Sequence, residues 1–313
     1  MKKKNLAFGE ILWDLLPTGP KLGGAPCNFA YRVNCLGDEG ILVSRIGRDE
    51  LGKRILDRVT SLGMETTYLQ IDPVHPTGTV PITLDAKQTP DFTILPNVAY
   101  DFIEVNDSLL NLASGIDCLC FGTLVQRAPT SRNTLQRLIE VSASSIKLLD
   151  INLRKDCYTL DSIISSLQTA DILKLNEDEA KYLTDRLGMS ARSIPDFCAA
   201  MIQQWSLTHC LVTLGERGSF AASKDREKVY VPGYRVNVID TCGSGDAFTA
   251  GWICRFMKDR ELVECCRVGN ALGAMTAAQP GATEPITPND LERFLETDGE
   301  RIIEDSLAAF LKD

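Results

Sequence analysis

The chain has 313 residues, of which 44% are hydrophobic, so it can bury the core of one large α/β domain or of two ordinary ones. Its 42 acidic residues outnumber its 33 basic residues, and the net charge is −9. No run of five lysines or arginines that could follow a phosphate backbone occurs, which argues against a nucleic-acid partner. Because no stretch approaches the roughly eighteen apolar residues of a membrane span, we expect a soluble, cytoplasmic protein without a membrane partner.

Short apolar segments of strand length recur along the chain, and helix-period patterns fill the intervals between them. They cover residues 41–47, 117–122, 146–152, 171–176 and 209–215. This alternation predicts parallel βαβ units and hence an α/β fold. Since ligands of open parallel sheets collect beyond the carboxyl ends of the strands, the residues just after each segment are the first candidates for a site.

Residues 77–97 follow a different pattern. In the segment TGTVPITLDAKQTPDFTILPN, apolar and polar residues alternate around the turn-like AKQTP. This predicts antiparallel strands with one solvated face, arranged as a small sheet beside the main one. An unpaired edge of such a sheet would be a plausible surface for homodimerisation.

The eleven cysteines do not follow a disulfide or zinc pattern. Their number is odd, no Cys-x-x-Cys pair occurs, and only His75 and His209 could complete a zinc site. We therefore expect reduced, mostly buried thiols.

Two glycine-containing segments imitate nucleotide-binding motifs. Residues 47–54, GRDELGKR, have the spacing of a P-loop, but Arg54 replaces the hydroxyl residue that would hold magnesium, and the loop carries acidic residues. In GSGDAF, Phe248 takes the place of the third glycine of a dinucleotide fingerprint. Neither a P-loop nor a nicotinamide site is supported.

Residues 240–251, DTCGSGDAFTAG, combine a permissive turn, a helix start and a carboxylate. The backbone N–H groups of Gly243, Ser244 and Gly245 can converge at the positive end of the following apolar helix and form an anion hole. Asp246 is then close enough to take a proton from a hydroxyl that attacks the bound anion. The alternative is a plain glycine-rich turn with Asp246 as a helix cap.

This stretch resembles the C-terminal signature of the ribokinase, or phosphofructokinase-B, family of carbohydrate kinases. Residues 21–37, KLGGAPCNFAYRVNCLG, are similar to the N-terminal signature of that family, and IGRDELG follows it. The matches extend from GEILWDLLP near residue 9 to QPGATEPITPNDL near residue 290. The resemblance implies one ribokinase-like domain over residues 1–313. Its fold would be a three-layer α/β/α sandwich with a mostly parallel central sheet and a small β-sheet lid, formed by about 10–22 and 66–97.

The resemblance also implies roles for individual residues. Asp246 would be the catalytic base, and Gly243, Ser244 and Gly245 the anion hole. Sugar contacts would come from Asp14, Gly23, Gly24, Asn28 and Arg154. Asp150, Asn152 and Arg154 stand in DINLR, similar to the Asp-x-Asn-x-Arg of fructokinases, but Ile151 replaces their usual proline, and a surface ion pair is the alternative for Arg154.

Nucleotide and metal contacts are implied in the same way. In NEDEA, Asn176 would contact the nucleotide and Glu179 would handle magnesium, through water, although the two also fit a helix cap. The remaining nucleotide contacts would be Thr213, Gly215 and Gly218 in TLGERG, and Asn270, for which helix packing is the alternative. A monovalent cation such as potassium would lie near Asp240, Cys242, Thr276, Gln279 and Gly281, although main-chain ligands leave little trace in a sequence.

Together these motifs imply an ATP- and Mg²⁺-dependent sugar kinase, most similar to fructokinases. Ala25 and Pro26 after the glycine pair favour fructose, with 2-keto-3-deoxygluconate kinase and ribokinase as alternatives. A non-catalytic sugar-binding regulator on the same scaffold is the alternative from a different class. The acid and both glycines of the predicted anion hole argue against it, because a binding protein has no use for a base there.

Overall fold

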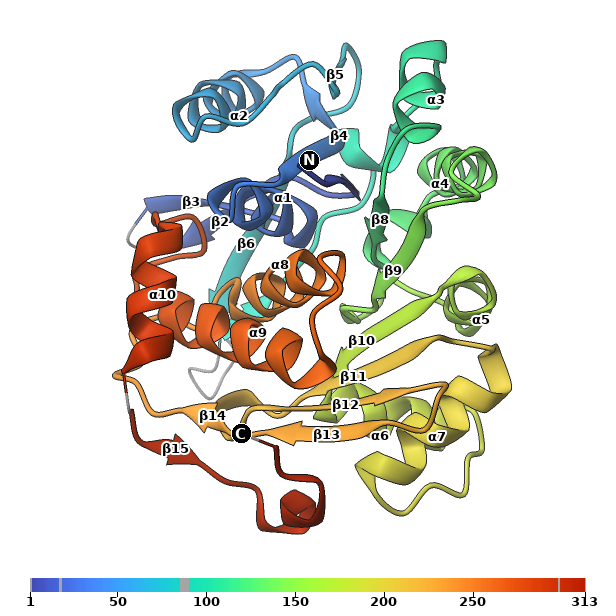
Figure 1. The fold of residues 1–313 in the computed structure, drawn as a ribbon. Helices are drawn as coiled ribbons and strands as arrows, with labels where there is room; N and C mark the ends of the chain where they lie inside the picture. Colours follow the sequence, from blue (N-terminus) through green and yellow to red (C-terminus); the bar gives the residue numbers. More distant parts are fainter. Residues whose placement is uncertain (1, 17–18, 85–89, 298, 313) are drawn as a thin grey trace.

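The computed structural model describes residues 2–16, 19–84, 90–297 and 299–312. Nine strands in these ranges form one central sheet, with every neighbouring pair parallel except the last two pairs at one edge (Figure 1). In sheet order they are β5 (Leu69–Asp72), β4 (Glu39–Gly47), β1 (Lys4–Phe8), β8 (Cys118–Phe121), β9 (Ile146–Asp150), β10 (Ile172–Asn176), β11 (His209–Thr213), β12 (Ser219–Ser223) and β13 (Lys228–Val231). The five strand segments predicted from the sequence are thereby confirmed.

Helices cover both faces of this sheet and complete a three-layer sandwich (Figure 1). One face carries α1 (Ala25–Cys35), α2 (Glu50–Ser61), α8 (Ser244–Phe256) and α9 (Leu262–Ala277), with α10 (Pro288–Glu296) packed on α9. The other face carries α3 (Asp107–Ala113), α4 (Pro129–Val141), α5 (Leu160–Thr169), α6 (Glu177–Arg186) and α7 (Ile194–Trp205). Short 3₁₀ helices span η1 (Ala99–Phe102), η2 (Leu124–Arg127), η3 (Gly215–Arg217) and η4 (Asp305–Phe310).

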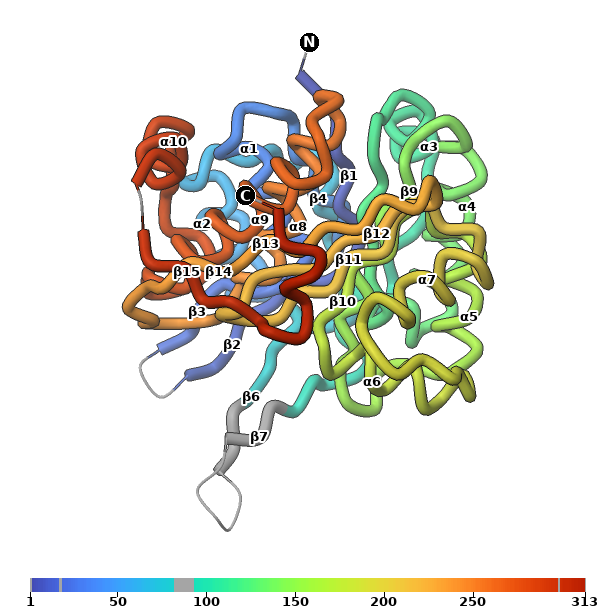
Figure 2. The backbone as a smooth tube through the Cα atoms, turned by 60° about the horizontal axis from the view of Figure 1, so that its bottom comes forward, coloured from blue at the N-terminus to red at the C-terminus, as the bar shows by residue number. Residues whose placement is uncertain are grey.

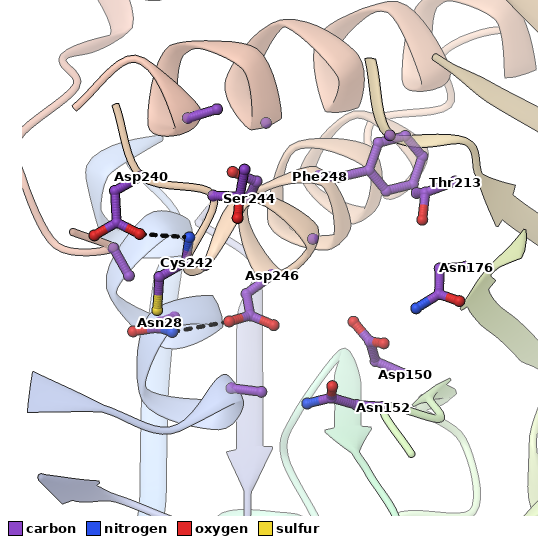
Figure 3. A pocket seen from close by; sticks show the side chains of 18 of the residues that line it. Asn28, Asp150, Asn152, Asn176, Thr213, Asp240, Cys242, Ser244, Asp246 and Phe248 are labelled. Atoms are coloured by element: carbon purple, nitrogen blue, oxygen red, sulfur yellow. Dashed lines mark hydrogen bonds between the residues drawn. The ribbon is translucent and has the colours of Figure 1, made fainter. Parts of the chain in front are cut away.

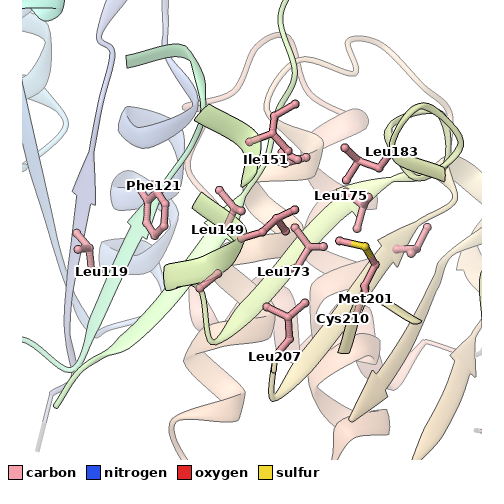
Figure 4. Close-up of a cluster of buried hydrophobic side chains, with 14 of the residues drawn as sticks. Leu119, Phe121, Leu149, Ile151, Leu173, Leu175, Leu183, Met201, Leu207 and Cys210 are labelled. Atoms are coloured by element: carbon pink, nitrogen blue, oxygen red, sulfur yellow. The ribbon is translucent and has the colours of Figure 1, made fainter. Parts of the chain in front are cut away.

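Alternate side chains of each central strand pack into different cores, because successive strand residues point to opposite faces. On β8, Leu119 and Phe121 join the core under α3–α7, whereas Cys118 and Cys120 join the core under α1, α2, α8 and α9. Figure 4 shows the first of these cores. All eleven cysteines lie in the described ranges and are free, and Cys242 is the exposed one, which agrees with the prediction of reduced, mostly buried thiols.

A smaller sheet stands beside the sandwich and projects beyond it (Figure 2). In the described residues its order is β3 (Gly19–Gly23), β2 (Leu12–Leu16), β6 (Gly78–Leu84) and β7 (Pro90–Phe92). The predicted start of its second part at residue 66 is wrong, since β5 pairs with β4 of the central sheet. The antiparallel prediction holds for β6 with β7, but β6 runs parallel to β2. Most of the turn predicted around 86–90 lies outside the described residues.

The topology places a ligand site near β1. The chain builds the sheet outward from β1 on both sides, with β4 as one neighbour and β8 as the other, so the strand order reverses there. Such reversals open a crevice at the carboxyl ends of parallel strands. A two-stranded ribbon of β14 (Gly233–Tyr234) and β15 (Arg301–Ile302) lies apart from both larger sheets. No helix among the described residues has the length and apolar character needed to cross a bilayer.

Candidate active site

A cleft of about 1110 Å³ lies at the carboxyl ends of the central strands and extends to the small sheet. Its helix wall is the start of α8, residues 243–246, and Figure 3 shows Asp246 of this wall and Asp150 opposite. What we call the strand wall is formed by Asp150 at the end of β9, Lys174 on β10 and Glu179 on α6. Besides residues 243–246, Asp150 and Glu179, the predicted residues that line the cleft are Asp14, Gly24, Asn28, Asn152, Arg154, Asn176, Thr213, Gly215, Gly218, Asp240, Cys242, Asn270 and Gly281. Most of the predicted site residues therefore line one cleft, although they come from segments that are far apart along the chain.

The helix wall begins with a left-handed glycine. Gly243 has φ 74°, and a Cβ there would lie 2.4 Å from Cβ of Ala282, so a larger residue cannot keep this turn. Among the described residues the N–H groups of Gly243, Gly245 and Asp246 have no hydrogen-bond partner, whereas the N–H of Ser244 donates to the carbonyl of Thr241. The unpaired donors at the positive end of α8 can bind an anion, with the amide of Asp246 in the place predicted for that of Ser244.

Asp246 lies in the first turn of α8, beside these amides. Its Oδ2 accepts a hydrogen bond of 2.8 Å from Nδ2 of Asn28, which lies on α1 (Figure 3). Burial, together with the negative charge of Asp150, raises the pKa of Asp246 to about 6, against the opposing effects of Asn28, Lys174 and Arg154. At neutral pH the carboxylate is thus mostly ionised, yet close enough to its pKa to accept a proton.

The strand wall carries side-chain charges held by hydrogen bonds. Nζ of Lys174 donates to Oδ1 of Asp150 at 3.1 Å. Both oxygens of Glu179 accept main-chain N–H groups, from Leu153 at 2.7 Å and from Asn176 at 2.8 Å, so this carboxylate is fixed in place. Burial raises the pKa of Glu179. The helix-cap interpretation of Asn176 and Glu179 is correct, and both side chains also line the cleft.

At the end of the cleft near the small sheet, the lining combines acidic groups with apolar side chains such as Leu12 and Val80. The carboxylate of Asp14 lies over the backbone of Gly23, where a Cβ would be 2.4 Å from its Oδ2. Burial raises the pKa of Asp14, with the positive charge of Arg154 opposing it. Glu10 is buried at the same end, and its Oε1 accepts the N–H of Ala25 at 3.3 Å. Burial raises the pKa of Glu10 to about 7.

Sequence reasoning missed Lys174 and Glu10. Lys174 had a signal, because a lysine in the apolar segment ILKLN must be buried with a partner. No sequence motif marked Glu10, apart from its position two residues after the end of β1.

Three predicted residues do not line the cleft, namely Gly23, Thr276 and Gln279. Asn270 lines it, but its Nδ2 donates to the carbonyl of Val231 at 2.9 Å, as the packing alternative requires. Arg154 is exposed, and no ion pair is found for it among the described residues, so the surface ion-pair alternative is not supported.

This arrangement can perform one kind of chemistry well. It places unpaired amides for an anion, a carboxylate near its pKa and acidic groups that can accept hydrogen bonds from a hydroxyl compound within one cleft. Amides aimed at a developing negative charge and a base within reach of a hydroxyl suit transfer of an anionic group to an alcohol.

Comparison with known proteins gives consistent results. The model of the pfkB family of carbohydrate kinases matches residues 18–289. Fructokinase-1 of Zea mays is 29% identical over 314 residues, covering 92% of this chain and 95% of its own. The fructokinase of Escherichia coli is 26% identical over 300 residues, covering 90% and 95%.

Solved structures of carbohydrate kinases share the fold. Fructokinase from Xylella fastidiosa with bound ATP superposes with a TM-score of 0.82 at 22% identity, covering 95% of this chain and 99% of its own. Fructokinase from Vibrio cholerae with fructose, ADP and calcium gives 0.80 at 25%, covering 94% and 99%. The 2-dehydro-3-deoxygluconokinase of Thermotoga maritima gives 0.82 at 16%, covering 94% and 100%. Equal scores for kinases of different sugars mean that the fold alone does not identify the sugar.

Proposed function

The chain belongs to the pfkB family of carbohydrate kinases, and on this basis we propose that it transfers the γ-phosphoryl group of ATP to fructose, giving fructose 6-phosphate. The observation that carries the proposal is the position of Asp246, directly beside the unpaired amides of the helix wall and hydrogen-bonded to Asn28. A base and an anion site within one helical turn are what phosphoryl transfer to an alcohol requires.

In the proposed reaction the helix wall acts on the phosphoryl group. The N–H groups of Gly243, Gly245 and Asp246 donate to its non-bridging oxygens, with the adjacent Ser244 completing the turn. Asp246 accepts the proton of the sugar hydroxyl as the new oxygen–phosphorus bond forms and the bond to ADP breaks. Asn28 holds the carboxylate in position for this transfer.

The acidic lining favours a neutral sugar over a sugar acid. Glu10, Asp14 and Asp240 all line the cleft, and the ammonium of Lys21 is already paired with Asp240 at 3.0 Å. Among the described residues that line this end, Arg154 thus remains as the cation for a substrate. A carboxylate such as that of 2-keto-3-deoxygluconate would meet net repulsion, whereas the hydroxyls of fructose can donate to these acids. The fructokinase relatives support the same choice.

At the other end of the cleft we propose that Asn176, Thr213, Gly215, Gly218 and Asn270 line the nucleotide site. Magnesium would arrive with ATP and would neutralise phosphate charge. No group of three or more His, Cys, Asp and Glu side chains in the described residues could hold a metal ion. Glu179 fits a contact through water, since both its oxygens already accept N–H groups. This suits an ion that binds mainly through phosphates and water.

The residues predicted for a monovalent cation such as potassium form a less complete site than those proposed for magnesium. The carboxylate of Asp240 already accepts from the N–H of Cys242 and from Lys21. In the turn that follows α9, however, the buried Oε1 of Gln279 has no partner among the described residues. Such an unpaired acceptor, with the carbonyls of Thr276 and Gly281 nearby in the chain, could serve a weakly bound cation.

We further propose that residues 1–313 act as one cytoplasmic kinase domain, with the small sheet as a lid over the sugar. Closing the lid would exclude water, which would otherwise compete with the sugar for the phosphoryl group.

Strand β3 forms an edge of the small sheet and could pair with a second copy of the chain. A monomer mass by light scattering at working concentration would exclude this dimer.

The experiment that tests the function is a substrate panel. ADP release is measured with ATP and Mg²⁺ in the presence of fructose, ribose, 2-keto-3-deoxygluconate or adenosine. We expect the highest kcat/KM with fructose. A higher value for another sugar would overturn the substrate. Sugar binding without any ADP release would instead support a non-catalytic regulator.

A further inference from the structure

Lys174 is a buried lysine in the middle of β10, and only 7% of its side chain is exposed. Its neighbours Leu173 and Leu175 point into the core under α3–α7, so the lysine points to the opposite face of the sheet, toward α8. Nζ donates to Oδ1 of Asp150, whose Oδ2 in turn accepts from the hydroxyl of Thr249 on α8 at 2.8 Å. The ammonium is therefore held between β9, β10 and α8.

The ammonium lies beside the helix wall. A Cβ placed on Gly245 would be 3.1 Å from Nζ of Lys174, so the lysine occupies the space that a side chain at 245 would need. Lys174 also lines the cleft. An anion bound by the amides of Gly243, Gly245 and Asp246 would thus be close to this positive charge.

The charges around Lys174 are unbalanced. Burial lowers the pKa of Lys174, but the carboxylates of Asp150, Glu179 and Asp246 outweigh burial and raise it above its usual value. Only Asp150 contacts the ammonium directly among the described residues, so two of its three N–H donors remain for a ligand in the cleft. A buried ion pair is by itself weak support for stability, which leaves a structural role as an incomplete explanation.

We propose that Lys174 is a further catalytic residue, which donates a hydrogen bond to a non-bridging oxygen of the γ-phosphoryl group from the strand wall while the amides of the helix wall bind that group from the other side. This inference rests on the proposed function. Lys174 keeps its proton throughout. The phosphorus–oxygen bond to ADP breaks, the bond to the sugar oxygen forms, and the sugar proton goes to Asp246. Asp150 and Thr249 hold the ammonium in place.

The test compares Lys174→Met with Lys147→Met. Lys147, on the neighbouring strand β9, is as buried as Lys174, with 6% of each whole residue exposed. Its Nζ, however, donates to the carbonyls of Ser142 and Ser145, and it does not line the cleft. For Lys174→Met we expect kcat to fall by about 10²-fold or more. Affinity for the β,γ-imido analogue of ATP should fall at least about 10-fold more than affinity for ADP, since ADP lacks the γ-phosphate. Lys147→Met should keep both the rate and this affinity ratio.

Loss of folding must not be mistaken for loss of catalysis. The double variant Asp150→Asn/Lys174→Met removes the carboxylate that pairs with the ammonium, so Asp150 is not left as a buried charge without its partner. It should show the same loss of preference for the imido analogue. In a crystal of the wild-type protein with this analogue and fructose, Nζ of Lys174 should lie within about 3.2 Å of a γ-phosphate oxygen.

Equal losses of ADP and analogue affinity in a folded variant, an unchanged kcat, or an ammonium in that crystal that contacts Asp150 alone would overturn the inference. If instead the wild-type protein releases no ADP with any sugar of the panel, the proposed function fails, and that result is distinguishable from failure of the lysine's role.

Discussion

The two walls of the cleft present charge in different ways. The helix wall offers main-chain N–H groups and one carboxylate within four consecutive residues, whereas the strand wall offers side chains that come from β9, β10 and α6. Backbone donors are fixed by the fold and need no reorganisation when charge develops. The strand-wall side chains are instead positioned by hydrogen bonds to one another, to Thr249 and to main-chain N–H groups. We therefore expect the largest loss of rate from a change in the helix wall. Lys174→Met in the strand wall should also lower the rate, whereas Asn28→Ala should act through the pKa of Asp246.

The largest effect is expected from Asp246→Asn. The amide cannot accept the sugar proton, so kcat should fall by about 10²- to 10⁴-fold. Affinities for fructose and for the imido analogue of ATP, measured by calorimetry, should stay within about threefold, because the shape of the helix wall is kept. A turnover close to that of the wild type would show that Asp246 is not the base. It would also contradict the expectation that the helix wall affects the rate more than the strand wall.

Gly243→Ala should distort the turn that begins the helix wall. The new Cβ would clash with Ala282, the turn would shift, and the loss of aligned amides should reduce kcat by about 10²- to 10³-fold. Gly63→Ala is the matched control, since Gly63 has φ 70° with nothing within 4 Å of a Cβ. Both variants should lose stability from left-handed strain, but the control should keep its rate. Similar rates in the two variants would contradict the account.

Asn28→Ala should have a smaller effect that depends on pH. The hydrogen bond from Asn28 lowers the pKa of Asp246, so its loss should raise that pKa above about 6. Because the base must be ionised, the acid limb of the kcat/KM profile should move to higher pH, with a loss of about 10-fold at pH 6. Asn34→Ala, on the same helix but bonded to Gly40, should leave the profile unchanged. An unchanged pH profile in Asn28→Ala would contradict the role of Asn28 in lowering the pKa of Asp246.

The smallest effect concerns stability. A carboxyl group whose pKa rises from 3.8 in the unfolded chain to about 6 in the folded one destabilises the fold at neutral pH, and this cost fades as the pH falls through that range. Without ligands, Asp246→Asn should therefore be more stable than the wild type by about 1–3 kcal/mol at pH 7.5, and the gap should narrow toward pH 4. Denaturant titrations at the two pH values measure the difference. A constant gap would mean that the pKa is not raised.

The same contrast explains what the sequence could predict. The residues of the helix wall are consecutive in the sequence. The single segment DTCGSGDAF therefore contains its turn, its N–H donors and its carboxylate, and the motif can be recognised without the structure. Residues 41–47 and 209–215 were recognisable as strands because burial on both faces makes such segments apolar throughout. The assignment of 66–97 to the small sheet failed at β5, because pairing with β4 is a long-range choice that local alternation does not specify.

The strand wall was harder to predict for a related reason. Asp150 and Lys174 are 24 residues apart and meet only when β9 and β10 pair. Asn270 lines the cleft, but its amide donates to the carbonyl of Val231, a partner too distant along the chain for a sequence pattern to reveal.

A crystal structure of the wild-type protein with fructose and a non-hydrolysable ATP analogue tests the central claim most directly. The account predicts a γ-phosphate on the N–H groups of Gly243, Gly245 and Asp246, with the fructose 6-hydroxyl within about 2.6–3.2 Å of the Asp246 carboxylate. A γ-phosphate bound away from α8, or an Asp246 carboxylate turned from the sugar with no water between them, would contradict it.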